Sequence, residues 1–168
     1  MPRSFDLSAD YSGSVEQVHS AFADKAYWQA RLADSGVDSA SLDSIAVDGD
    51  GSVAVVTTQR LRSDRLPGVV RQFHHGDLEI VRHEKWTPVT DGAARAEVGG
   101  EVRGAPVSLS GSAVLAPANA GSRLQITVSV DVDVPLVGGK LEDFIGTHLN
   151  DLIAAEQRFT TKWIAEHH

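Results

Sequence analysis

Residues 123–140 read RLQITVSVDVDVPLVGGK, a segment whose pattern changes at Pro135. Up to Val134 apolar and polar residues alternate, which is the period of a β-strand with one dry face. Such clean alternation is typical of an antiparallel sheet with its other face in water. Pro135, Gly138 and Gly139 end the strand, and the spacing beyond them predicts a long helix to about Glu166.

The predicted C-terminal helix carries a single apolar stripe. Plotted at about 100° per residue, the stripe forms a narrow sector. It consists of Leu141, Ile145, His148, Leu152, Ala155, Phe159 and Trp163. Because the rest of the helix is polar, we expect it to lie along the dry face of the preceding sheet, the only large apolar surface on offer.

The upstream pattern changes between strand and helix periods. An alternating N-terminal segment predicts a first strand. Ser14 opens a capping-box signature and predicts a short helix, and a second helix is expected from about Asp24 to Ser35, stopped by Gly36. From Leu42 to Val134 the period is two almost throughout, which predicts about six strands.

Composition narrows the class of protein. The 168 residues fit one domain, 1–168, with no repeat or linker to divide them. The absence of cysteine excludes a thiol nucleophile, and a net charge of −8 argues against a nucleic-acid partner. No apolar run approaches the ~20 residues that span a bilayer, and the start lacks a signal peptide. We therefore expect a cytoplasmic protein without integral membrane association.

The order of elements, ending in Val134-Pro135-Leu136-Val137-Gly138-Gly139-Lys140 before the helix, resembles that of the START-like (SRPBCC) helix-grip superfamily. This group includes polyketide cyclase-like and pollen-allergen-like proteins, and the chain looks like an actinobacterial-type branch of it. The resemblance implies an α+β fold, with a strongly curved antiparallel sheet of about seven strands wrapped around the last helix. It also implies a cavity between them that in many members holds an apolar small molecule. The superfamily has no universal catalytic motif, so no catalytic residue is carried over.

Small residues on the dry faces support a cavity independently of the resemblance. They are Ala94, Ala96, Gly100, Gly111 and Ala113. A filled core would have large apolar side chains at such positions. Small residues also allow a helix to lie close against a sheet, so the sequence leaves open both a hollow and tight packing.

The predicted strand 77–86 places charges on its dry face. Continuing inward from Leu78, the same face receives Arg82 and Glu84 before Trp86. Either the two charges line a polar part of a cavity, or a bulge after Val81 flips the register. We favour the polar wall, to which Gln59 of an adjacent strand would contribute. A buried Arg82–Glu84 ion pair and separate surface pairs are both compatible with the sequence.

His148 is the one polar group on the helix stripe. It could hydrogen-bond a ligand or act as an acid or base near neutral pH. The alternative is a histidine satisfied by a backbone carbonyl. With Arg82 and Glu84 it would suffice for proton transfer on a carbonyl compound, with Glu84 or His148 as base and Arg82 stabilising an oxyanion.

Two further segments have functional and ordinary interpretations. The segment 63–75 mixes apolar side chains with arginines and is either a gate or a simple connection. His74, His75 and Asp77 are able to bind a metal, but such residues on a loop normally face water. Nucleotide, dinucleotide and zinc-protease motifs are absent, so we expect no metal and no cofactor.

We therefore expect the chain to bind an apolar or amphipathic small molecule, lipid- or polyketide-like, between sheet and helix. The residues expected to contact it are Gln59, Arg82, Glu84, Trp86, His148, Leu152 and Phe159. One alternative is a cyclase, dehydratase or isomerase that uses the same cavity; a protein-binding adaptor without a ligand is another. We favour a non-enzyme. The sequence is compatible with a homo-oligomer but does not determine the oligomeric state.

Overall fold

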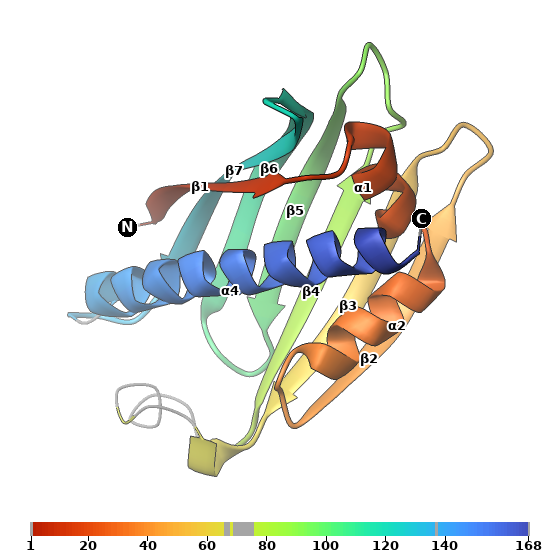
Figure 1. Ribbon diagram of the computed structural model, residues 1–168. Helices are drawn as coiled ribbons and strands as arrows, with labels where there is room; N and C mark the ends of the chain where they lie inside the picture. The colour runs from red at the N-terminus through yellow and green to blue at the C-terminus, as the bar shows by residue number, and fades with distance from the viewer. Residues whose placement is uncertain (1, 66–67, 69–75, 137, 168) are drawn as a thin grey trace.

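The computed structural model describes residues 2–65, 68, 76–136 and 138–167. Its elements are β1 (Arg3–Tyr11), α1 (Val15–Phe22), α2 (Lys25–Asp34), β2 (Ser39–Val47), β3 (Val53–Leu61), the 3₁₀ turn η1 (Ser63–Arg65), β4 (Leu78–Trp86), β5 (Ala94–Val102), β6 (Val107–Ala118), β7 (Gly121–Val132) and α4 (Gly138–Glu166). The strands form one antiparallel sheet in the order β1-β7-β6-β5-β4-β3-β2. Figure 1 shows this sheet curving around α4, which confirms the expected α+β arrangement.

Local signals position the two short helices. Gln17 N–H donates to Ser14 Oγ at 3.2 Å, and Ser14 N–H donates to Gln17 Oε1 at 2.9 Å, so the predicted capping box is present. Asp24 caps α2 by accepting from Ala26 N–H at 2.9 Å. Gly36 follows the end of α2 with φ of 77°, a left-handed conformation that glycine adopts without strain.

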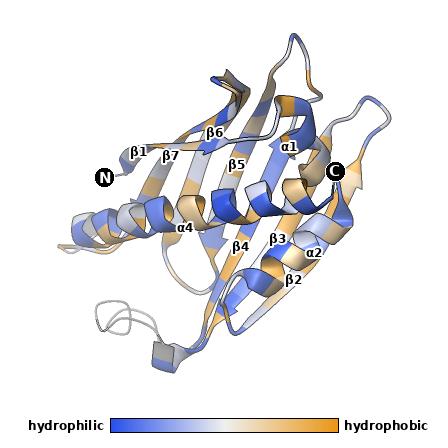
Figure 2. Cartoon of the chain, viewed as in Figure 1, coloured by the Kyte–Doolittle hydropathy of each residue, from blue (hydrophilic) through white to orange (hydrophobic). Residues whose placement is uncertain are grey.

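The pairing of β4 decides which way its charges point. β4 pairs with β3 without interruption, from Leu78 opposite Leu61 to Trp86 opposite Val53. The predicted alternative of a bulge after Val81 is therefore wrong, and Arg82 stays on the same face as Trp86. Figure 2 shows hydrophobic and hydrophilic residues alternating along the strands, as the sequence pattern predicts.

Helix α4 packs against β1 and β7, and its buried face differs from the predicted stripe. The most buried residues are Gly138, Leu141, Glu142, Gly146, Thr160 and Ile164. At ~100° per residue most of them lie about a quarter turn from the stripe. His148 and Ala155, expected to be deep, are exposed. The stripe was thus wrong as the packed face of the helix, because α4 contacts the sheet edge through small residues and hydrogen-bonded polar residues that an apolar pattern does not identify.

Among the described residues, buried apolar side chains form two groups. The larger lies where α1 and α2 cover the sheet and includes Phe22, Tyr27, Trp28, Trp86 and Leu115. The smaller lies near the start of α4 and is formed by Val130, Val132 and Leu141. Within the described ranges, no helix is both long and apolar enough to cross a membrane.

Candidate ligand-binding cavity

A cavity of about 720 Å³ lies between the concave face of the sheet, α4 and the end of α2. Its volume falls within the roughly 300–1,000 Å³ of typical small-molecule sites. Apolar side chains dominate the walls, among them Ile80, Val98, Val102 and Leu109 from the sheet and Ile145 and Leu152 from α4. Both arrangements that the small residues allowed occur, since Gly100 lines the cavity whereas Ala94 and Ala96 lie in the packed aromatic core.

Gly100 shows why the space stays empty. It is buried in β5, directly opposite Arg82 on β4 and Leu109 on β6, and it lines the cavity. A Cβ atom added there would meet Val81 O at 3.4 Å, which is ordinary contact. The strand therefore has room for a Cβ atom at this position, and glycine leaves that room empty.

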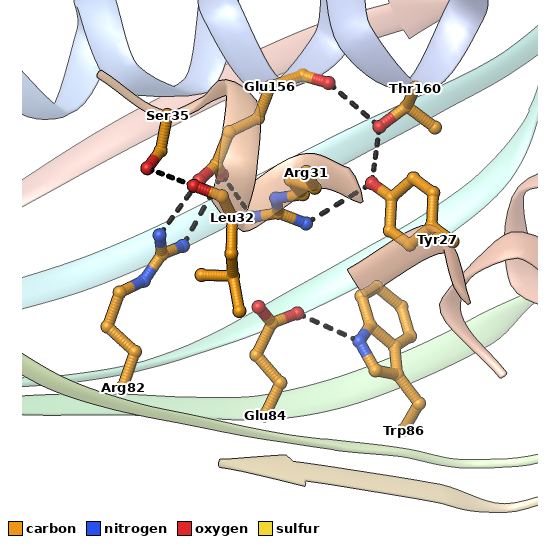
Figure 3. Close-up of polar contacts among 9 residues, drawn as sticks. All are labelled: Tyr27, Arg31, Leu32, Ser35, Arg82, Glu84, Trp86, Glu156 and Thr160. Carbon is orange, nitrogen blue, oxygen red and sulfur yellow. Dashed lines mark hydrogen bonds and ion pairs between the residues drawn. The ribbon is translucent and has the colours of Figure 1, made fainter. Parts of the chain in front are cut away.

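A largely buried ion bridge lines the cavity and joins three elements (Figure 3). Arg82 of β4 donates to both carboxylate oxygens of Glu156 on α4, through Nη1 at 2.8 Å and Nη2 at 3.3 Å. Arg31 of α2 reaches the same carboxylate, with Nη2 2.6 Å from Oε1. The sequence left open an Arg82–Glu84 pair or separate surface pairs, and the actual partner of Arg82 is neither.

The bridge is ionised at neutral pH. Burial opposes the charge of Glu156, but the guanidinium groups of Arg31 and Arg82 outweigh it and lower the pKa of the carboxyl from 4.5 to about 2. Burial likewise opposes the charge of each arginine, and the attraction of Glu156 nevertheless raises both arginine pKa values above the ordinary 12.5. The three groups act as one fixed, charged unit.

Hydrogen bonds tie this bridge to the aromatic core. Thr160 Oγ1 donates to Glu156 O at 2.7 Å, so the Tyr27 hydroxyl, 2.6 Å from Thr160 Oγ1, is the donor in the next link. Arg31 Nη1 donates to the Tyr27 hydroxyl at 3.3 Å. The Arg31 guanidinium also lies 4.5 Å from the centre of the Trp28 ring, a cation–π contact. These contacts hold Arg31 in one position.

The structure brings four of the predicted site residues together on the wall of the cavity. Gln59, Arg82, Glu84 and Trp86 all line the cavity from β3 and β4. The indole Nε1–H of Trp86 donates to Glu84 Oε1 at 3.0 Å. Leu152 also lines the cavity, from α4.

Of the other two predicted residues, Phe159 lies outside the cavity wall and His148 lies at the rim of the cavity. The Phe159 ring packs against Tyr27, with centroids 5.8 Å apart, and is not part of the cavity wall. His148 is exposed at the rim of the cavity. Its Nδ1 lies 3.0 Å from Phe144 O, so Nδ1 carries the proton and the ring is satisfied by a backbone carbonyl. Among the interactions of the described residues, none joins His148 to Arg82 or Glu84, so the structure does not assemble the three-residue catalytic set.

Tyr11, Arg31 and Glu156 are among the site residues that the sequence did not predict. Arg31 lies between Trp28 and Leu32 on the buried side of α2, and a charge at that position was a signal that it has a partner. Glu156 gave no such signal, because it follows Ala154 and Ala155 on a helix rich in charged residues.

The loop and metal predictions lie partly outside the described residues. Residues 66–67 and 69–75, which carry most of the predicted gate and both His74 and His75, are outside them. Among the side chains that the structure does describe, no group of three or more His, Asp or Glu is arranged to hold a metal ion.

Solved structures share the fold at low identity. A Thermus thermophilus protein aligns with a TM-score of 0.60 and 12% identity, covering 99% of this chain and 98% of its own. Norcoclaurine synthase from Thalictrum flavum aligns with a TM-score of 0.57 and 13% identity, covering 99% and 88%. Ara h 8.0201 aligns with a TM-score of 0.55 and 10% identity, covering 99% of each chain. The fold is thus the helix-grip fold.

Relatives of much higher identity occur in mycobacteria. Uncharacterized proteins of Mycobacterium bovis and Mycobacterium tuberculosis are 54% identical over 170 residues, covering 98% of both chains. Residues 6–164 match the model of a family described as "Protein of unknown function (DUF2505)". The chain therefore belongs to the DUF2505 family.

Proposed function

We propose that the chain binds an apolar or amphipathic small molecule, lipid- or polyketide-like, in the cavity between the sheet and α4. The supporting observation is the cavity itself, about 720 Å³ with mainly apolar walls and polar groups gathered at one end. Such a combination favours a ligand with an apolar body and a small polar part.

Each part of the wall has a physical role in this proposal. Ile80, Leu109 and Leu152 offer apolar surface, and burial of a ligand against it contributes about 25 cal/mol per Å². The ion bridge of Arg31, Arg82 and Glu156 supplies a rigid polar end. The fold shared with the solved structures supports the SRPBCC superfamily for this chain, and the mycobacterial relatives support an actinobacterial-type branch.

We favour binding without turnover. Catalysis by the expected residues needs an arginine free to stabilise an oxyanion and a base within reach of the same atom. Arg82 donates instead to Glu156, and His148 bonds to the backbone of its own helix. Norcoclaurine synthase is an enzyme by name, but its similarity to this chain extends to the fold alone.

The test is to fill the cavity by one substitution and leave its walls intact. Gly100→Ile places a side chain in the hollow where a Cβ meets no close contact. Gly49→Ile is the matched control, because it makes the same change in the β2–β3 turn, where no atom lies within 4 Å. Circular dichroism checks that both variants fold.

The probe is N-phenyl-1-naphthylamine, a neutral dye whose fluorescence rises in apolar surroundings. We expect saturable binding of one dye per chain, weakened at least about tenfold by Gly100→Ile, a loss of roughly 1.4 kcal/mol, and unchanged by Gly49→Ile. Lack of saturable binding to the parent protein, or equal binding by both variants, would contradict the proposal.

A further inference from the structure

Glu84 lines the cavity, and one of its two carboxylate oxygens, Oε2, accepts no hydrogen bond from the described residues. Its side chain is on the inner face of β4 and is half-buried. Trp86, only 2% exposed, donates to Oε1 and so fixes the orientation of the carboxylate. The described residues provide no hydrogen bond to Oε2, and that atom is not sealed from the cavity. A carboxylate oxygen in such a place favours a ligand that donates a hydrogen bond.

The arginines beside it are already engaged. Arg82 uses two N–H groups on Glu156 in a bidentate pair, and Arg31 donates to Glu156 and to Tyr27 (Figure 3). The two arginines and the two carboxylates of Glu84 and Glu156 have a formal sum of zero. The polar end therefore has no excess positive charge for an anionic head group.

Two uncharged polar side chains, Tyr11 and Gln59, also line the cavity. Each is 6% exposed, and neither side chain is hydrogen-bonded by the described residues. Burial, followed by the effect of Tyr27, raises the pKa of Tyr11 well above its ordinary 10, so its hydroxyl keeps the proton. Tyr11 and Gln59 are thus able to donate to a ligand oxygen.

We propose that the ligand carries a hydroxyl group, alcoholic or phenolic, that donates to Glu84 Oε2 at the polar end of the cavity. The oxygen of such a hydroxyl is in turn free to accept a hydrogen bond, and Tyr11 and Gln59 are donors that line the same cavity. A carboxylate ligand offers only acceptors and adds a negative charge beside Glu84. This inference rests on the proposed function and specifies its ligand class.

The experiment compares ligands that differ only in the polar group. We measure displacement of N-phenyl-1-naphthylamine at pH 7.5 by 2-naphthol, 2-naphthoate, 2-methylnaphthalene and 2-naphthylmethylamine. We expect 2-naphthol to bind at least about tenfold more tightly than 2-naphthoate and 2-methylnaphthalene, because of these three only the naphthol donates a hydrogen bond to the charged carboxylate.

Variants then assign this preference to Glu84. Glu84→Gln replaces one carboxylate oxygen with a donor and is expected to reduce the naphthol/naphthoate ratio to below about threefold. Glu97→Gln is the matched control, since Glu97 is exposed on the neighbouring strand and outside the cavity, and it should leave the ratio unchanged. If Glu84→Gln does not fold, Tyr11→Phe is the second variant, with an expected loss of about threefold in naphthol affinity.

The possible failures are distinguishable. If the dye does not bind at all, the proposed function fails and this inference fails with it. If the dye binds but naphthoate or naphthylmethylamine displaces it as well as naphthol does, only the hydroxyl inference is overturned. Retention of the full preference in Glu84→Gln, or of full naphthol affinity in Tyr11→Phe where that variant is the one used, overturns it too.

Discussion

The two ends of the concave face of the sheet are covered in different ways. Where α1 and α2 lie over it, aromatic rings fill the space, with the centroid of Phe22 5.2 Å from that of Trp86 and 6.2 Å from that of Trp28. Towards the opposite end α4 is the main cover, and it leans on β1 and β7. A cavity of about 720 Å³ remains beside it.

The strands alone do not account for this difference. β6 presents Leu115 to the solid end, where it is fully buried, and Leu109 to the hollow end, where it is half-buried. The same residue type on the same face of one strand has different neighbours because different helices lie opposite. Whether the space over a strand is filled therefore depends also on which helix lies opposite it.

Truncating these two leucines is the strongest test of the comparison. We expect Leu115→Ala to lower the free energy of unfolding by about 3–5 kcal/mol, because it leaves a new cavity in a packed core. Leu109→Ala should cost only about 1–2 kcal/mol, since part of its side chain already faces empty space. Urea unfolding monitored by tryptophan fluorescence measures both. Equal losses would show that the hollow end is packed in solution.

The ion bridge lies between the two ends and should make stability depend on pH. The folded pKa of Glu156, about 2, is below the ordinary 4.5, so its contribution is present above about pH 5 and is lost as the pH falls towards 2. The shift corresponds to roughly 3 kcal/mol at 1.36 kcal/mol per pKa unit. Unfolding in urea at pH 7, 5, 4 and 3 gives the slope. Glu156→Gln should flatten it, whereas Glu97→Gln should keep it.

Gly146 probes the packed side of α4. A Cβ atom at this position would collide with the Phe5 ring of β1. We expect Gly146→Ala to lower the free energy of unfolding by about 1–3 kcal/mol, despite the better helix propensity of alanine, because the ring or the helix must move. Thermal unfolding measures the change, and an increase in stability would mean that α4 does not sit tightly on β1.

Gly100 is the corresponding probe on the hollow side and should show the smallest effect. Its Cβ would make only ordinary contacts. Gly100→Ala is expected to raise the free energy of unfolding by about 0.5–1 kcal/mol, because alanine loses less backbone freedom on folding. The same thermal unfolding experiment gives the value. A loss comparable to that of Gly146→Ala would contradict the presence of free space beside β5.

The sequence predicted which strand residues face the cavity, but not which charged side chains contact one another. The inward position of Arg82, Glu84 and Gln59 followed from the period of β3 and β4, and the structure places all three at the cavity. The partner of Arg82 could not be predicted, because Glu156 lies 74 residues away on another element. Phe159 was misplaced for a related reason, since its neighbour Tyr27 belongs to α2.

The sequence by itself determined the order of the elements, their caps and the inner face of each strand. These depend on local period and turn chemistry, as Ser14, Gly36 and the alternation up to Val134 show. Only the tertiary structure decided which side of α4 is buried, which charges meet and where space remains. Those features depend on how elements far apart in the chain pack together. A pattern of apolar residues also cannot reveal that α4 packs through Gly146 and Glu142, because neither has a large apolar side chain.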